Sequence, residues 1–237
     1  MPRMSRKLIL IAVLLAVLLF AGAAFYAYRT YLGGRNALVW RFLGSPAENA
    51  ALMSPAGHQC PGAPFQLPTS GYIGYLWHDR FKLFNLHQGL DIFGGEEAGL
   101  TPIYAPYDGF LTRAADWKST IVLRVPSDPL QPQRQIWLYM THLADAEGES
   151  LIVPAFPPGS AEVAVKRGDL LGYQGNFSGD PSRPVGVHLH FSIVLDDGSG
   201  KISNELKIEN TLDPSPYFGM QLDARQAAAG KPSCIEK

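Results

Sequence analysis

Gly186-Val187-His188-Leu189-His190-Phe191-Ser192-Ile193-Val194 places polar and apolar side chains almost in alternation. Such a pattern is typical of a β-strand with one buried face, because successive side chains of a strand point to opposite sides. We therefore expect a strand over 188–194, with both histidines on the same face. The apolar neighbours are expected to point the other way, into the core; they are Val187, Leu189 and Phe191.

Other short runs along the chain have the same character. Their β-branched and aromatic residues favour strands, and Gly, Pro or Asp separates one run from the next. No helical pattern longer than two turns comes between them. The sequence therefore predicts a β-rich domain. The runs are 103–105, 109–112, 120–125 and 136–140.

Three stretches between these runs are long and rich in loop-forming residues. Loops of this length in a compact domain are often functional, so we expect them to form walls of a cleft. They are 126–134, 145–160 and 177–186.

The N-terminus has the composition of a membrane anchor. Arg3, Arg6 and Lys7 precede an uncharged run over 8–28, which as a helix would be roughly 30 Å long, the thickness of the bilayer core. Basic residues ahead of the span predict a cytoplasmic N-terminus and an exported body. A cleaved signal peptide with Ala21-Gly22-Ala23 as its cleavage site is the alternative, but the apolar run is longer than its usual 7–15 residues. The body is expected in the periplasm or outside the cell in both cases.

These features divide the chain into four expected parts. The formal net charge is −1, which gives no basic footprint for nucleic acid. Export permits a disulfide between Cys60 and Cys234, but the second lies in a tail of loose composition, so the pairing is left open. The parts are an anchor over 1–30, a spacer over 31–63, the main domain over 64–220 and a tail over 221–237.

Four of the six histidines fall into patterns that suit a metal site. In an extended segment, His87 and Asp91 would face the same side, as would His188 and His190. His142 comes just after the run 136–140. Zinc takes histidine nitrogen and carboxylate oxygen, and catalytic zinc sites use three protein ligands. Three of these five groups would bind the metal, and two would remain for acid–base work.

Each pattern alone also has a structural interpretation, in which the histidine packs in the core or lies on the surface. The ordered combination, however, resembles the LytM and lysostaphin-type family of peptidoglycan metallopeptidases. The matching segments cover about half of the chain in the family's order. They are His87-Gln88-Gly89-Leu90-Asp91, Leu100-Thr101-Pro102-Ile103-Tyr104-Ala105, Asp108-Gly109, His142-Leu143, Gly168-Asp169-Leu170-Leu171-Gly172-Tyr173-Gln174-Gly175 and Gly186-Val187-His188-Leu189-His190-Phe191.

The resemblance implies a role for each of the five polar groups. His87, Asp91 and His190 would hold zinc, while His142 and His188 would serve as general base and as stabiliser or proton donor. It also implies an all-β fold, an antiparallel β-sandwich or barrel-like domain with an open groove for an extended peptide. The expected activity is endopeptidase cleavage of peptidoglycan stem peptides or cross-links close to the membrane, with a regulatory protein partner possible.

Two departures from the family pattern concern tyrosines. Met140 stands where the family has a tyrosine two residues before the third histidine, and Tyr139 lies one position earlier. A tyrosine that would stabilise the transition state cannot be placed, and Tyr72 and Tyr75 are both candidates.

Three other functions remain open at this stage. One is a non-catalytic module of the same fold that binds the wall and regulates another wall hydrolase. Another is an unrelated exported β-domain with structural histidines. A third is a different zinc hydrolase, such as an esterase or a deacetylase.

Overall fold

The computed structural model describes residues 5–28, 33–80 and 86–236. Two helices begin the chain, α1 (Arg6–Ala27) and α2 (Gly34–Gly44), followed by the short 3-10 helix η2 (Ala47–Leu52). Arg3 and the expected boundary between anchor and spacer at residues 30 and 31 lie outside the described residues.

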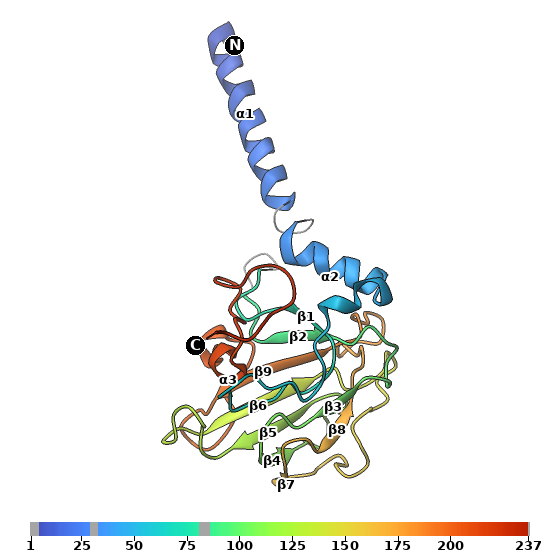
Figure 1. The fold of residues 1–237 in the computed structure, drawn as a ribbon. Helices are drawn as coiled ribbons and strands as arrows, with labels where there is room; N and C mark the ends of the chain where they lie inside the picture. Colours follow the sequence, from blue (N-terminus) through green and yellow to red (C-terminus); the bar gives the residue numbers. More distant parts are fainter. Residues whose placement is uncertain (1–4, 29–32, 81–85, 237) are drawn as a thin grey trace.

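The body is built from antiparallel strands in two sheets (Figure 1). The larger sheet has seven strands in the order β1-β2-β9-β6-β5-β4-β7, and the smaller one pairs β3 with β8. The all-β, antiparallel prediction is therefore confirmed, and a strand lies in each of the expected runs. The strands are β1 (Tyr72–Tyr75), β2 (Leu90–Phe93), β3 (Pro102–Tyr104), β4 (Gly109–Thr112), β5 (Ile121–Val125), β6 (Ile136–Thr141), β7 (Val163–Val165), β8 (Leu170–Tyr173) and β9 (Leu189–Leu195).

One hydrophobic core joins the two sheets. Ile103 of β3 and Leu171 of β8 belong to the same buried cluster as Leu138 of β6 and Phe191 of β9. Residues from both sheets thus share their apolar faces, which gives the sandwich-like arrangement that the resemblance implied.

Strand β9 lies between β2 and β6 and shows the expected alternation. Leu189 and Phe191 are fully buried, whereas His190 faces the other side of the sheet. The register places His190 opposite Asp91 of β2 and opposite Thr141 of β6. The expectation that Val187 points into the core is wrong, because this residue precedes the strand and is only half-buried.

The segment expected to be a spacer packs against the domain through α2. Val39 and Phe42 are buried in a cluster with Tyr72 and Phe93. The hydroxyl of Tyr75 in β1 also donates a hydrogen bond to Asn36 Oδ1. Helix α2 is therefore part of the folded body.

The C-terminal tail is tied to the same body. A disulfide joins Cys60 to Cys234, and Met220 forms a β-bridge with Cys234. The pairing that the sequence left open is thus present in the structure.

Reducing this disulfide is expected to lower the free energy of unfolding by about 2–5 kcal/mol, since the bond closes a long loop, with the two cysteines 174 positions apart. Denaturant unfolding of the parent and of a variant with both cysteines changed to serine tests this. Equal midpoints for the two proteins would contradict a stabilising role.

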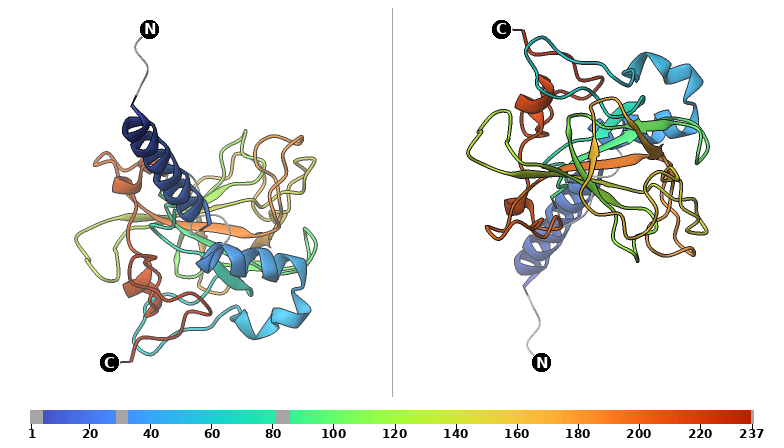
Figure 2. Two further views of the ribbon diagram at one scale, coloured as in Figure 1. Left: turned by 90° about the horizontal axis from the view of Figure 1, so that it is seen from above. Right: turned by 90° about the horizontal axis from the view of Figure 1, so that it is seen from below.

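Helix α1 extends away from the sheets (Figure 1), so that it overlaps them when the molecule is seen from above or below (Figure 2), and none of its residues is buried. Within the described part of the chain, it is the one helix long and apolar enough to cross a membrane. Its length, composition and position near the N-terminus also fit a signal sequence.

Candidate metal centre and active site

An open groove of about 700 Å³ lies over β2, β6 and β9. Helix α2 contributes one side through Val39, Trp40 and Leu43, and the loop 177–186 contributes several lining residues. Of the three loops expected to form cleft walls, only this last one lines the groove; 126–134 and 145–160 do not. All five polar residues that the sequence singled out also line it.

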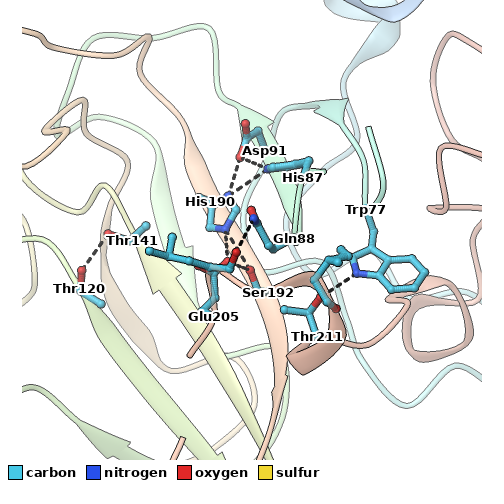
Figure 3. A network of polar contacts seen from close by, with 12 residues as sticks. Trp77, His87, Gln88, Asp91, Thr120, Thr141, His190, Ser192, Glu205 and Thr211 are labelled. Carbon is cyan, nitrogen blue, oxygen red and sulfur yellow. Dashed lines mark hydrogen bonds and ion pairs between the residues drawn. The ribbon is translucent and has the colours of Figure 1, made fainter. Parts of the chain in front are cut away.

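His87, Asp91 and His190 meet at one point of the groove (Figure 3). Asp91 Oδ1 lies 3.1 Å from His87 Nε2 and 2.8 Å from His190 Nδ1, and the two nitrogens are 3.1 Å apart. The strand register explains the approach of Asp91 and His190. His87 lies before β2 rather than within it, and hydrogen bonds between its backbone and residues 78 and 79 hold it there.

The spacing and chemistry of these three atoms fit a zinc ion. Ligand bonds of about 2.0–2.1 Å in a tetrahedral site leave ligand atoms about 3.3 Å apart, close to the observed separations. Two imidazoles and one carboxylate form a donor set that zinc accepts in catalytic sites. A second group of potential ligands among the described residues, His58 with Cys60 and Cys234, has both sulfurs in the disulfide and so offers no thiolate.

A hydrogen bond to a backbone carbonyl defines which nitrogen of His87 faces the candidate metal centre. Its Nδ1 lies 3.0 Å from the carbonyl oxygen of Leu76. A carbonyl oxygen only accepts, so Nδ1 carries the hydrogen, and the lone pair of Nε2 points toward Asp91 and His190.

His142 and His188 lie beside the three candidate ligands, with their ring centroids 4.5 Å apart. Nδ1 of His142 donates to the carbonyl of Phe177 at 2.7 Å, and Nδ1 of His188 donates to the carbonyl of Gly186 at 2.6 Å. In each neutral ring Nε2 is then the atom that can accept a proton. His188 Nε2 lies 3.6 Å from Asp91 Oδ1, so this nitrogen faces the candidate metal centre.

The backbone at His142 is unusual. Its φ of +70° lies in the left-handed region that only a few per cent of non-glycine residues adopt. This conformation follows directly on the end of β6 and is a feature often found at functional sites.

The surroundings shift the pKa values of these groups in opposite directions. Burial, reinforced by His188, lowers the pKa of His142 to about 3, and burial also lowers that of His188. Burial alone would lower the pKa of His190, but hydrogen bonds to the Asp91 and Glu205 carboxylates raise it to about 10. Burial would raise the pKa of Asp91, but the neighbouring histidines hold it well below its usual value. His142 and His188 are therefore neutral at pH 7, and Asp91 is ionised.

The structure distinguishes between Tyr72 and Tyr75, the two tyrosine candidates that the sequence left open. Tyr75 lines the groove, with its ring centroid 6.3 Å from that of His87, whereas Tyr72 is fully buried in the cluster under α2. Tyr139 also lines the groove, and Met140 is buried in the core.

Glu205 is a site residue that the sequence analysis missed. Its Oε1 lies 2.9 Å from His190 Nε2 and accepts a hydrogen bond from Ser192 Oγ at 2.6 Å. Ser192 occupies the next position of β9 on the same face as His190, so alternation along the strand could have indicated that Ser192 belongs to the site. Glu205 comes from a loop after β9, and no local pattern marks it.

Fold and site together define an antiparallel β-protein with a candidate His/Asp metal centre in an open groove. No protein-family model matches the sequence, and no curated protein matches it. Several solved structures are similar to the chain, and the three described below are a protein assigned to peptidase M23, an M23 protein and lysostaphin.

A protein from Pseudomonas aeruginosa that is assigned to peptidase M23 is 21% identical over 76% of this chain and 60% of its own, with a TM-score of 0.39. The catalytic domain of the prophage-encoded M23 protein EnpA from Enterococcus faecalis is 21% identical over 63% of this chain and 94% of its own, with a TM-score of 0.36. Lysostaphin is 17% identical over 68% of this chain and 54% of its own, with a TM-score of 0.38. Sequence identities and TM-scores this low carry no argument about activity, so the activity of this chain has to be argued from its own site.

Proposed function

We propose that this chain is a zinc-dependent endopeptidase that hydrolyses peptide bonds in the stem peptides or cross-links of peptidoglycan. The observation that carries the proposal is the convergence of His87 Nε2, Asp91 Oδ1 and His190 Nδ1 beside two neutral histidines in one open groove. The order of the matching sequence segments, given above, supports peptidoglycan as the substrate.

In this proposal His87, Asp91 and His190 hold zinc, and His142 and His188 carry out proton transfer. Zinc, when bound, polarises the scissile carbonyl and acidifies water. Nε2 of His142 or His188 accepts the proton of the attacking water, because Nδ1 of each ring is already committed to a backbone carbonyl. That same histidine then returns the proton to the leaving amine as the C–N bond breaks, and the other histidine stabilises the oxyanion once its own Nε2 carries a proton.

The shape of the site suits a peptide chain. The groove is open and lies over the outer face of the sheet, and its rim carries two exposed apolar side chains, Trp40 of α2 and Leu206. Of the two tyrosine candidates from the sequence, Tyr72 and Tyr75, we propose that Tyr75 contacts a bound substrate, because its side chain lines the groove near His87.

We further propose that α1 anchors the protein in the cell membrane as a single span, with the catalytic domain in the periplasm or outside the cell. The apolar length of α1 and the basic residues before it support this orientation. Cleavage of α1 as a signal peptide would instead release a secreted enzyme.

The experiment is a digest of purified cross-linked peptidoglycan with the full chain in detergent micelles and zinc, analysed by mass spectrometry. We expect new amine ends in the parent reaction and none after chelation, with fragment masses that identify the bond. Zinc bound at one ion per chain without any new amine ends would contradict the enzyme and favour a wall-binding module that regulates another hydrolase.

A further inference from the structure

The two histidines of the candidate metal centre are oriented in different ways. His87 is fixed by a backbone carbonyl, that of Leu76. His190 instead has a carboxylate on each side of its ring. Asp91 Oδ1 lies 2.8 Å from Nδ1, and Glu205 Oε1 lies 2.9 Å from Nε2. Figure 3 shows Glu205 on the side of the His190 ring away from Asp91.

Glu205 is held in place before any ligand arrives. Its side chain is only 10% exposed, and Ser192 Oγ donates a hydrogen bond to the oxygen that faces His190. The backbone beside it is held as well, because Gln88 Nε2 donates to the carbonyl of Leu206 at 3.0 Å. Gln88 follows His87 directly in the sequence. The segment that carries the candidate ligand His87 is therefore also hydrogen-bonded to the loop that carries Glu205.

A carboxylate on the far nitrogen of a metal-binding histidine has two effects. It fixes the tautomer and the ring orientation, because the nitrogen that donates to it cannot bind the metal. It also makes the ligating nitrogen more basic, which strengthens the metal bond. At this site Glu205 would keep the hydrogen on Nε2 of His190 and leave Nδ1 for the metal.

We propose that Glu205 is a positioning residue that orients His190 and sets the affinity of the centre for zinc, with Gln88 holding its loop. This inference rests on the proposed function only in taking zinc as the metal. It assigns no contact between Glu205 and substrate.

The test is the zinc dissociation constant of the full chain in detergent micelles, measured by competition with a chromophoric chelator. We expect Glu205→Gln, which keeps the size of the side chain but removes its charge, to weaken zinc binding about 10–100-fold. Gln88→Ala leaves the carboxylate in place but frees its loop, and we expect a smaller weakening in the same direction. Glu209→Gln is the matched control, because Glu209 is an exposed residue close to Glu205 in the sequence. The zinc affinity of this variant should equal that of the parent.

A second readout separates orientation from general damage to the fold. The ¹⁵N shifts of His190 in the zinc-loaded protein should show Nε2 protonated in the parent and a changed Nε2 signal in Glu205→Gln, while thermal unfolding of the metal-free proteins stays similar. Zinc affinity of Glu205→Gln within twofold of the parent, with an unchanged Nε2 signal, would overturn the inference. Failure of the parent itself to bind zinc would instead overturn the proposed function, and the inference with it.

Discussion

Replacing His190 with alanine is expected to abolish both zinc binding and peptide hydrolysis. Nδ1 of this residue is one of the three atoms that converge on the candidate metal centre, 2.8 Å from Asp91 Oδ1. Its loss leaves two protein ligands where catalytic zinc sites use three. The affinity should therefore fall by more than the roughly 10–100-fold typical of losing a partner outside the ligand set.

The measurement is zinc content after dialysis against a weak chelator, together with release of amine ends from peptidoglycan. His58→Ala is a suitable control, since His58 is exposed and lies outside the groove. It should keep one zinc per chain and the parent's rate. A His190→Ala protein that retained one tightly bound zinc would show that the metal centre lies elsewhere.

The second large effect is expected for His188→Ala, and it has a different form. His188 lies beside the candidate ligands but is not one of the three, and its Nε2 is 3.6 Å from Asp91 Oδ1. Loss of a positioned acid or base costs about 10²–10⁴-fold in rate. We therefore expect hydrolysis to fall by that factor while zinc binding stays close to that of the parent.

Zinc content and rate have to be measured on the same preparation of His188→Ala for this comparison. His188 also stacks on Phe93, with ring centroids 5.0 Å apart, so thermal unfolding should be recorded alongside. A folded variant that lost its zinc together with its activity would show that His188 is a ligand, and the assignment of roles would then be wrong.

Much of the fold could be predicted because strand periodicity is local. The alternation around His188 and His190 gave β9, and the runs 103–105, 109–112, 120–125 and 136–140 gave four more strands. The packing of α2 could not be predicted in this way. Val39 and Phe42 form too short an apolar pattern to show that the helix docks on β1, and their burial depends on residues distant in sequence, Tyr72 and Phe93.

The five candidate site residues were also visible in the sequence, and the structure brings all of them into one groove. Local spacing explains only part of this. Asp91 meets His190 through the register between β2 and β9, which the spacing of neither segment specifies. Glu205 was missed because it reaches His190 from a loop, and the hydrogen bond from Gln88 to the adjacent Leu206 joins segments distant in sequence.

Whether Cys60 and Cys234 form a disulfide also depends on tertiary contacts, which the sequence does not show. The composition of the tail suggested loose order, yet Ile235 N donates to the carbonyl of Gly219 and positions the chain beside Cys60. The disulfide itself joins two residues 174 positions apart in the sequence, and no local pattern predicts such a pairing.

The most direct measurement of the central claim is the position of zinc in a crystal of the zinc-loaded protein, located by anomalous diffraction on both sides of the zinc absorption edge. We predict one peak per chain, within bonding distance of His87 Nε2, Asp91 Oδ1 and His190 Nδ1. A peak at another group of residues, or no peak in protein shown to be folded, would contradict the account.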